Sequence, residues 1–516
     1  MFLHILVATI AILCGVFAFK LSCNTSLKDI PKAHWSVSIS PIWILWIRFQ
    51  QMENATVQAV HMKKGPIVRL GPNEISINSV DAGLRTVYGS FEKHRWYRSF
   101  WNLGKPNMFS FENFQLHSER RRVLSRVYSK TNLFRSPLLR SQNQHILYAR
   151  LKNVLDEHAE HGQPLEMVAT MLAVTMDVVT AFLFGLPNSS NLIEDLEQRQ
   201  VRLAQYQCRS PYAFFEQELQ SIWKLLEKLS LVVVPKHVRV ATASFEHWVV
   251  TMCEGAVRKS SHQQEPENSA QSDTVVELLH QSMDQERSSN KAEDWNREVA
   301  SEMTDHIIAG HETSGIALAY LIYELSRSPN LQARLHKEVK ALFGGEAAED
   351  KLPCFSAIDQ LPFLHACTLE ILRAYPPIVG PQARVTPPDG CILGGFVIPG
   401  GVRVSARASC LHRNPSVYPS PSEFRPERWL DSKRCITKVS EAPELYHYWW
   451  AFGSGGRGCL GNHFAMHDIK VVAVFLYSLF ETIVVDHGDL NQTEGYIGAP
   501  QGGRLLIKLK RRNEIH

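Results

Sequence analysis

The sequence predicts a mainly α-helical protein, a large helical body with small peripheral β-sheets behind an N-terminal transmembrane helix. Helical hydrophobic patterns dominate residues 118–343, short β-like segments occur on both sides of that stretch, and residues 2–19 form an apolar run without formal charge. Hydrophobic residues make up 45% of the chain and charged residues 21%, as in an ordinary globular protein. This composition excludes a disordered chain, a collagen-like repeat and a membrane protein with many spans.

The N-terminal apolar run is long enough to cross a bilayer. About eighteen helical residues at about 1.5 Å each span roughly 27 Å, close to the thickness of the hydrocarbon core. A cleaved signal peptide is the alternative, but it would carry positive charge before the apolar run, whereas Lys20 and Lys28 follow it. The positive-inside rule keeps the rest of the chain on the cytosolic side. We therefore expect a single-pass anchor at 1–20, a membrane-proximal linker at 21–60 and one large domain at 61–516.

Two further apolar segments could lie either at a membrane or in the protein core. Residues 42–47 contain Trp43 and Trp46, which is typical of a segment at the membrane interface, and an ordinary core helix fits them equally well. Residues 167–186 are almost apolar enough for a second span. Asp177 and three threonines in that stretch favour a buried core helix.

The remaining elements follow from local patterns. Short strands are expected at 67–70 and 75–77, within 391–404 and at 504–509, and a long helix is expected at 301–325. The segment 259–290 is rich in Ser, Gln, Glu and Asn. It predicts an exposed connection that is interrupted by one short helix around residues 275–279.

Charge and cysteine content narrow the class of protein. The 55 Lys and Arg residues against 51 Asp and Glu residues leave a net charge of +4, which is no footprint for nucleic-acid binding. Ten cysteines in 516 residues are too few for a disulfide framework. They indicate reduced thiols, one of which could carry chemistry.

One cysteine lies in a distinctive loop. Residues 452–461 read Phe-Gly-Ser-Gly-Gly-Arg-Gly-Cys-Leu-Gly and match F-x-x-G-x-R-x-C-x-G at every fixed position. Crowded glycines let backbone N–H groups approach a sulfur, and Arg457 with nearby amides would favour the thiolate of Cys459, a strong axial donor to haem iron. A dinucleotide-binding loop has a different glycine spacing and follows a strand. An inert buried cysteine would leave Phe452 and Arg457 unexplained.

With this loop the chain resembles a cytochrome P450 of the microsomal, membrane-anchored type. The resemblance covers roughly residue 60 to the C-terminus and rests on four motifs in the order that is usual for the family. It implies the cytochrome P450 fold, haem b bound through Cys459 as the axial ligand of the iron, and a place in the endoplasmic reticulum membrane with the catalytic domain in the cytosol. Residues 65–76 (GPIVRLGPNEIS) and 106–110 (PNMFS) are similar to P450s of filamentous-fungal secondary metabolism.

The second motif is Ala-Gly-His-Glu-Thr at residues 309–313, within the long helical pattern. The resemblance implies that this helix crosses the distal face of the haem, that Glu312 and Thr313 form an acid–alcohol pair for proton delivery, and that Ala309 and Gly310 leave room for O₂ and substrate. A zinc-binding H-E-x-x-H motif is excluded because its fifth position is Gly315. A solvated glutamate on a helix is the remaining alternative.

The other two motifs concern support and cofactor binding. Glu370 and Arg373 form an E-x-x-R pair, and by resemblance Arg428 of the PERW segment completes a buried structural triad that braces the cysteine loop. The segment from His117 to Arg121 resembles the W-x-x-x-R motif, with His117 where Trp is commonest. Arg121, Arg384 and Arg457 would then pair with the haem propionates, and His117 could donate a hydrogen bond there. A solvated basic face at 120–122 is the alternative.

The resemblance implies a haem-thiolate monooxygenase that takes electrons from NADPH through cytochrome P450 reductase, with cytochrome b5 as a second candidate donor. The substrate would be an apolar small molecule, for which a terpenoid or polyketide is expected and a xenobiotic or fatty acid is the alternative. Asp305 and His306, one turn before Ala309, could add a polar contact. A non-enzymatic, membrane-tethered haem-binding protein is the alternative of a different class, but it has no use for the pair Glu312 and Thr313.

Overall fold

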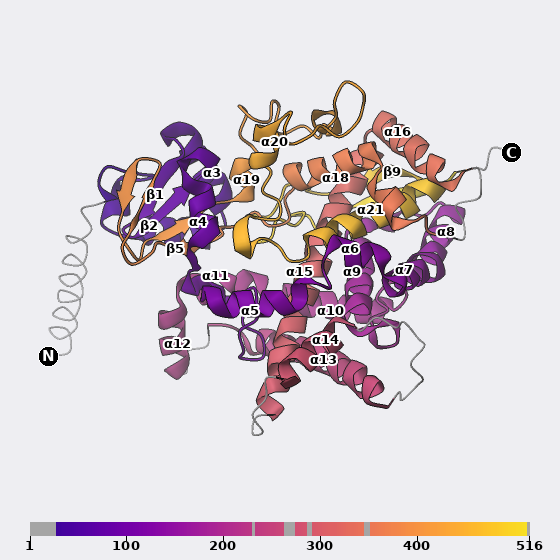
Figure 1. The fold of residues 1–516 in the computed structure, drawn as a ribbon, viewed down its shortest axis with the longest axis horizontal. Helices are drawn as coiled ribbons and strands as arrows, with labels where there is room; N and C mark the ends of the chain where they lie inside the picture. Colours follow the sequence, from indigo (N-terminus) through magenta and orange to yellow (C-terminus); the bar gives the residue numbers. More distant parts are fainter. Residues whose placement is uncertain (1–26, 230–232, 263–273, 286–291, 345–350, 513–516) are drawn as a thin grey trace.

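The computed structural model describes residues 27–229, 233–262, 274–285, 292–344 and 351–512. It has a helical body with sheets at its periphery, so the predicted mainly helical fold is confirmed (Figure 1). The predicted anchor at 1–20 lies outside the described residues. The α-helices are α2 (Ile42–Phe49), α3 (Glu53–Lys64), α4 (Arg85–Ser90), α5 (Phe114–Ser125), α6 (Lys130–Arg135), α7 (Pro137–Gln144), α8 (Lys152–Glu160), α9 (Met167–Phe184), α10 (Leu196–Gln207), α11 (Ala213–Glu218), α12 (Gln220–Lys228), α13 (Lys236–His262), α14 (Val275–Gln285), α15 (Ala292–Ser326), α16 (Pro329–Lys340), α17 (Phe355–Asp359), α18 (Pro362–Ala374), α19 (Ala408–Leu411), α20 (Pro443–His447) and α21 (Asn462–Leu479).

The described strands form three small sheets. A five-stranded sheet has the order β1-β2-β8-β5-β3, a three-stranded sheet the order β4-β10-β9, and β6 pairs with β7 in a hairpin. The two larger sheets lie near opposite ends of the long axis, with the helices between them (Figure 1). The strands are β1 (Ile67–Gly71), β2 (Glu74–Ile77), β3 (Glu92–Lys93), β4 (Leu165–Glu166), β5 (Arg384–Val385), β6 (Cys391–Leu393), β7 (Phe396–Ile398), β8 (Arg403–Ser405), β9 (Phe480–Asp486) and β10 (Leu506–Arg511).

Helix α9 is the buried partner of the long helix α15. Glu166 caps its first turn by accepting hydrogen bonds from the amides of Val168 and Ala169, and Gly185, at a φ of 79°, ends it. Within the described part of the chain it is the one helix long and apolar enough to cross a membrane, and 94% of it is buried in the protein. The prediction of a core helix is therefore confirmed.

The polar side chain inside α9 is satisfied internally. Asp177 accepts hydrogen bonds from the Ser190 hydroxyl and from the amides of Leu192 and Ile193, so a buried carboxyl closes the loop that follows the helix. Close contact with α15 is made possible by Gly310, where an added Cβ would lie 2.7 Å from a Val179 methyl group. This contact places the face of α15 that carries residues 309–313 deep inside the molecule.

The segment 27–60, which was expected as a linker, packs onto the five-stranded sheet. Ile44 of α2 and Val57 of α3 form a buried cluster with Val68 and Leu70 of β1. Arg48 is also buried, and its guanidinium lies 2.9 Å from the Glu53 carboxylate. Local sequence did not indicate this packing because the partners of these side chains come from later parts of the chain.

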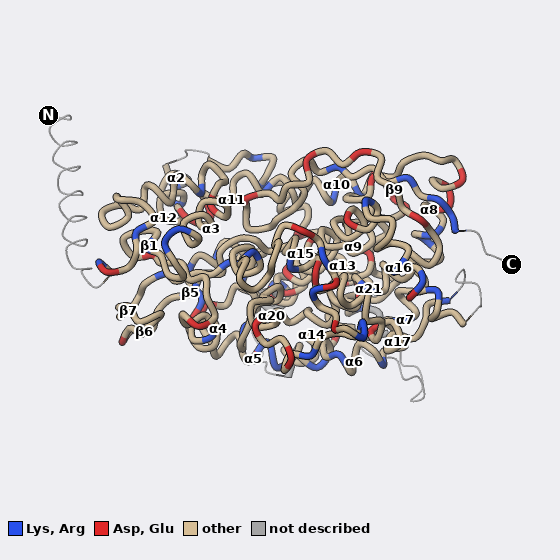
Figure 2. The backbone as a smooth tube through the Cα atoms, turned by 90° about the horizontal axis from the view of Figure 1, so that it is seen from above, with Lys and Arg blue, Asp and Glu red and all other residues tan. Residues whose placement is uncertain are grey.

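The region around residues 259–290, the cysteines and the charged residues can also be compared with the expectations from the sequence. Helix α14 (Val275–Gln285) confirms the short helix predicted around residues 275–279 and is longer than expected, and α13 continues to His262 into the polar segment. The eight cysteines among the described residues are free thiols. Basic and acidic residues are scattered over the described part of the chain in Figure 2, with no large region of one sign, in keeping with the small net charge.

Candidate active site

The loop that carries Cys459 lies between α20 and α21 and is a tight backbone structure. The Cys459 amide donates to the Phe452 carbonyl at 2.8 Å, and the Gly458 amide donates to the Gly455 carbonyl at 3.0 Å. Gly455 has a φ of 70°, and a Cβ there would collide with the backbone carbonyl of Tyr88. The glycine at this position is therefore required both by backbone conformation and by the approach of a neighbouring segment.

Protein surrounds Cys459, yet its side chain is accessible. Burial raises the pKa of the Cys459 thiol to about 11, while a hydrogen bond from the Gly461 amide and the Arg121 guanidinium act in the opposite direction. The side chain is nevertheless exposed. A residue that is enclosed and accessible at the same time faces an internal space. Burial thus favours the neutral thiol, and a metal cation bound at the sulfur would favour the thiolate.

The opposite wall of this space is α15. Ala309 is exposed although Ile307 and His311 beside it are buried, so the accessible face of α15 is an inner one. The Asp305 carboxylate of the same helix is near enough to act on the Cys459 thiol, and both act on the buried Tyr128. The structure thus brings the cysteine loop and the Ala309 segment to the two sides of one interior space.

Glu312 and Thr313 lie on this segment but do not hydrogen-bond each other. The Thr313 hydroxyl donates to the Ala309 carbonyl at 2.6 Å. One carboxylate oxygen of Glu312, Oε2, accepts a short hydrogen bond from the Tyr206 hydroxyl of α10. Burial raises the pKa of Glu312 to about 7, and the hydrogen bond from Tyr206 lowers it in part. A carboxyl group with this pKa can both give and take a proton near neutral pH.

A cluster of basic side chains converges beside the cysteine loop. Burial lowers the pKa of His117 to about 3, with further lowering by Lys93, Arg457, Arg121 and Arg384. Burial and the nearby Arg384 also lower the pKa of Arg457 to about 10. In the part of the chain that the structure describes, none of these five side chains has an ion pair with a carboxylate. Positive charges gathered in the interior without acidic partners leave a place for an anionic group.

Unpaired donors in the basic cluster support the same conclusion. His117 Nδ1, Arg384 Nε and Arg457 Nε are buried atoms without a hydrogen-bond partner. Arg121 donates to the Gly458 carbonyl at 2.7 Å, which ties it to the cysteine loop. Arg457 instead donates to the Phe111 and Glu112 carbonyls, both at 2.7 Å. The charge that acts on the Cys459 thiol therefore comes from Arg121, whereas the sequence had suggested Arg457.

The sequence did not indicate Lys93 as a member of this basic cluster. It is a buried residue of β3, and its ammonium group lies 4.6 Å from the Tyr97 ring centroid and 4.5 Å from that of Phe109. Burial lowers the pKa of Lys93 well below its usual value. No motif surrounds it, and only the fold brings β3 next to the segments of His117 and Arg457, so the sequence carried no usable signal.

The structure brings Glu370, Arg373 and Arg428 together in the interior. Arg373 donates twice to the Glu370 carboxylate, at 2.8 Å each, and Arg428 Nε donates to it at 2.9 Å. Trp429 Nε1 adds a further bond at 2.9 Å, which the sequence had not indicated. Glu370 and Arg373 are both fully buried. These contacts join α18 to the PERW segment.

His412 connects this triad to the cysteine segment. Its Nε2 accepts from the Trp450 amide at 2.7 Å, so Nδ1 carries the proton and donates to the Arg373 carbonyl at 3.2 Å. Burial lowers the pKa of His412 to about 3, which keeps the ring neutral and Nε2 available as an acceptor. The stretch that leads into Phe452 is thereby held against α18.

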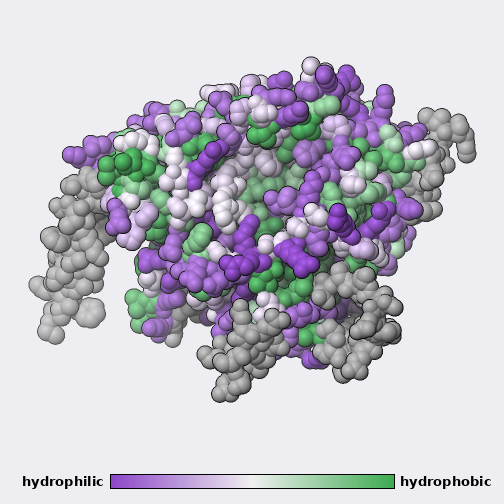
Figure 3. All heavy atoms as spheres, viewed as in Figure 1, coloured by the Kyte–Doolittle hydropathy of each residue, from purple (hydrophilic) through white to green (hydrophobic). Residues whose placement is uncertain are grey.

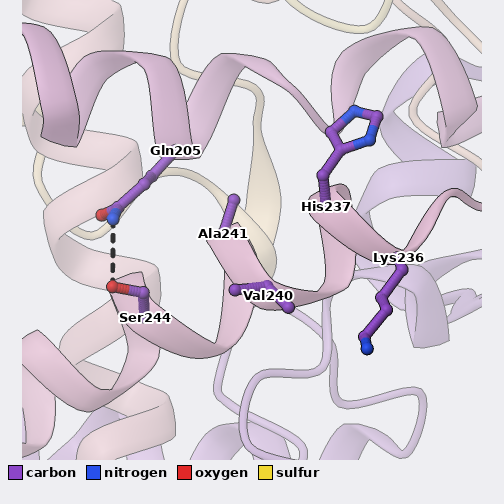
Figure 4. A pocket seen from close by; sticks show the side chains of 6 residues that line it. All are labelled: Gln205, Lys236, His237, Val240, Ala241 and Ser244. Carbon is purple, nitrogen blue, oxygen red and sulfur yellow. Dashed lines mark hydrogen bonds between the residues drawn. The ribbon is translucent and has the colours of Figure 1, made fainter.

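The pocket drawn in Figure 4 lies elsewhere, on the surface between α10 and α13. It has a volume of about 520 Å³ and is lined by Gln205, Lys236, His237, Val240, Ala241 and Ser244. None of the predicted site residues lines it. Gln205 donates to the Ser244 hydroxyl at 3.0 Å, which fastens α10 to α13 beside Tyr206.

The sequence of the chain is similar to those of known proteins. The family profile of cytochrome P450 matches residues 40–504. The chain is 28% identical to cytochrome P450 monooxygenase avaI of Aspergillus versicolor over 81% of this chain and 95% of that protein. It is 26% identical to cytochrome P450 monooxygenase gsfF of Penicillium aethiopicum over 95% and 96% of the two chains. It is 27% identical to cytochrome P450 monooxygenase sdnE of Sordaria araneosa over 83% of each.

Proposed function

Because the chain belongs to the cytochrome P450 family, whose members are haem-thiolate oxidoreductases, we propose that it is a monooxygenase that inserts one oxygen atom of O₂ into a C–H bond of an apolar small molecule. The observation that carries the proposal is the shared interior space, which Cys459 faces from one side and the Ala309 segment of α15 from the other. A passive haem carrier needs the cysteine but gains nothing from Glu312 and Thr313 beside it.

The residues of this space fit a haem group. Cys459 would be the axial ligand of the iron, and Lys93, His117, Arg121, Arg384 and Arg457 would meet its two propionates with charge-assisted hydrogen bonds. When bound, haem supplies the iron at which O₂ is reduced. Phe452 and Gly310 are assigned only to shaping the loop and the α15 surface around it.

Glu312 and Thr313 would deliver protons. The Glu312 carboxyl can exchange a proton near pH 7, and the Thr313 hydroxyl lies on the next residue with its proton donated to the Ala309 carbonyl. A water between the two groups would carry a proton from the carboxyl to the hydroxyl, while the surrounding helices exclude bulk water.

Replacing Thr313 by alanine should uncouple the reaction. We expect haem content to stay near that of the parent, while most of the NADPH consumed ends as hydrogen peroxide, because the hydroxyl that passes the proton is gone. Peroxide formed per NADPH oxidised measures the effect. Thr313→Ser, which keeps a hydroxyl, is the matched control and should stay largely coupled. Tight coupling in the alanine variant would remove Thr313 from proton delivery.

The substrate class is supported by the relatives and by apolar residues near the site. The relatives are fungal P450 monooxygenases, and the GPIVRLGPNEIS segment resembles those of secondary metabolism, so a terpenoid or polyketide is proposed. Phe109 packs with Tyr97 and Phe100 next to Lys93. Phe214 and Phe215 contact Phe49 of α2, which suits an entrance rather than the reaction space.

Electrons would come from NADPH through cytochrome P450 reductase, with cytochrome b5 as a second donor, at the cytosolic face of the endoplasmic reticulum. An apolar surface supports the membrane assignment. Ile42, Trp46 and Phe49 of α2 are exposed by 50% or more, and so are Ile222 and Leu225 of α12. Helix α11 contacts α2, and Figure 2 shows α2, α11 and α12 at the same end of the molecule. Figure 3 shows another hydrophobic patch at the end that carries β1 and β2.

Deleting residues 1–20 should release much of the protein from membranes. The apolar run would supply most of the binding free energy, and the exposed α2 surface would leave weaker, reversible binding. Flotation with phospholipid vesicles, with the full chain as control, measures the change. Trp46→Glu in the shortened chain should abolish the remaining binding. If the shortened chain floats as well as the full chain, α2 and α12 rather than residues 1–20 form the anchor.

A further inference from the structure

We propose that Tyr206 of α10 is the positioning residue for proton delivery: its hydroxyl holds the Glu312 carboxylate in place and keeps it ready to exchange a proton. The inference rests on the proposed monooxygenase function and extends it to a residue of another helix. Tyr206 lies 106 residues before Glu312 in the chain, and its hydroxyl donates a hydrogen bond to Glu312 Oε2.

The phenol ring of Tyr206 has a fixed place. It lies edge-on to the His311 ring, with centroids 5.4 Å apart, and 6.4 Å from the Phe245 ring of α13. His311 is itself fixed, because its Nδ1 bonds the Ile307 carbonyl at 2.9 Å and its own carbonyl accepts from the Thr175 hydroxyl at 2.7 Å. The Tyr206 hydroxyl is therefore held toward α15 by packing of the ring against α15 and α13.

Because of this hydrogen bond, the two carboxylate oxygens of Glu312 have different roles. Glu312 Oε2 accepts from Tyr206, whereas no described residue hydrogen-bonds Oε1. The free oxygen is the one that can bind a water leading to Thr313. Without the hydroxyl, both oxygens could turn toward α10, and the route to Thr313 would be lost for part of the time.

The charge balance around the pair makes Tyr206 decisive for the titration of Glu312. Burial raises the pKa of Glu312 to about 7, and the Tyr206 hydroxyl is the group that opposes this rise. Arg209, two residues after the end of α10, and Asp305 of α15 act on the pKa of Tyr206. His311 of α15 faces the phenol, and burial lowers its pKa to about 4, so it is neutral here. From α13 the phenol meets Phe245, and from α9 Thr175 bonds the His311 carbonyl; neither side chain carries a charge.

The Tyr206 hydroxyl determines the direction in which the pKa of Glu312 would change. A donor that bonds the ionised carboxylate stabilises the charged form, so removing the hydroxyl raises the pKa of Glu312 further. A hydrogen bond to a charged group corresponds to a shift of about one to two pH units. At neutral pH the carboxyl of a Tyr206→Phe variant would be almost entirely protonated and would give up its proton less readily.

Infrared difference spectra recorded on photolysis of bound CO test the inference, because they report carboxyl groups near the reaction space at each pH. The band that disappears in Glu312→Gln identifies Glu312. We expect it to titrate near pH 7 in the parent and one to two units higher in Tyr206→Phe. Tyr375→Phe is the matched control, since Tyr375 donates to Glu324 of the same helix at 2.6 Å, far from the site. It should leave the Glu312 band unmoved.

The possible results distinguish a failure of the Tyr206 inference from a failure of the proposed function. A Glu312 band that titrates near pH 4 in the parent overturns the inference without any variant. A band that titrates at the same pH in Tyr206→Phe as in the parent overturns it as well. Both results would leave the monooxygenase function standing if the parent shows a haem-thiolate spectrum. A parent without that spectrum contradicts the proposed function itself, whatever Tyr206 does.

Discussion

Replacing Glu370 by glutamine should prevent the chain from reaching a stable folded state. The Glu370 carboxylate accepts bonds from Arg373, Arg428 and Trp429 and is fully buried. Loss of its charge leaves the buried Arg373 guanidinium without its counter-ion, which costs about 3–5 kcal/mol. Since a folded protein is stable by only about 5–15 kcal/mol, we expect a large fall in the urea midpoint and in soluble yield.

The effect should reach the cysteine loop through His412. Arg373 holds His412 by its carbonyl, and His412 accepts from the Trp450 amide at the start of the loop segment. Glu427→Gln is the control, because Glu427 pairs with Arg334 on the surface and is half exposed. That change should alter stability by less than about 1 kcal/mol. Equal urea midpoints for Glu370→Gln and the parent would contradict the bracing role of the triad.

Replacing Arg384 by glutamine should weaken haem binding by about ten- to a hundredfold. Arg384 Nε is buried without a hydrogen-bond partner, and a lost charge-assisted bond costs about 1.5–3 kcal/mol. Arg384→Gln combined with Lys93→Met should lose more than either alone, because both would meet the same anionic group. Titration of the haem-free protein with haemin measures the affinities. Arg122→Gln is the matched control, since Arg122 is exposed on α5 next to Arg121.

The basic cluster also predicts the pH dependence of haem binding. Burial and neighbouring cations lower the pKa values of His117 and Lys93. Bound propionates favour the protonated forms of both groups, so the cluster takes up protons on haem binding, whereas ligation by Cys459 releases the thiol proton. A Lys93→Met variant should lose part of the proton uptake, and its haem affinity should therefore rise more steeply with pH than that of the parent. A Lys93→Met variant whose haem affinity has the same pH dependence as that of the parent, or an Arg384→Gln variant that binds as tightly as Arg122→Gln, would show that the cluster does not meet the propionates.

The sequence predicted those parts of the fold and site that depend on residues close together in the chain. Met167–Phe184 was predicted as a core helix because its apolar content and Asp177 are local features, and the cysteine loop was recognisable because its glycines and Arg457 occupy fixed spacings. The strands at 67–77 also followed from local pattern. These features need no knowledge of distant contacts.

What the sequence did not indicate depends on contacts between distant segments. Glu312 belongs to a motif, but Tyr206 lies 106 residues earlier in the chain and is by itself an ordinary helical residue. Lys93 joins the basic cluster only because β3 pairs with β5, next to Arg384. The packing of residues 27–60 likewise depends on β1. The influence of Arg121 in place of Arg457 on Cys459 depends on side-chain direction, which spacing in a motif does not determine.

The most direct test of the central claim is the difference spectrum of the reduced protein with CO. If Cys459 is the axial ligand, the parent should show the strongly red-shifted Soret band of a thiolate-bound haem, and Cys459→Ala should lose it. Peroxide assays and substrate searches would then rest on an established centre. A parent spectrum of the kind given by histidine-bound haem, or a red-shifted band that persists in Cys459→Ala, would contradict the account.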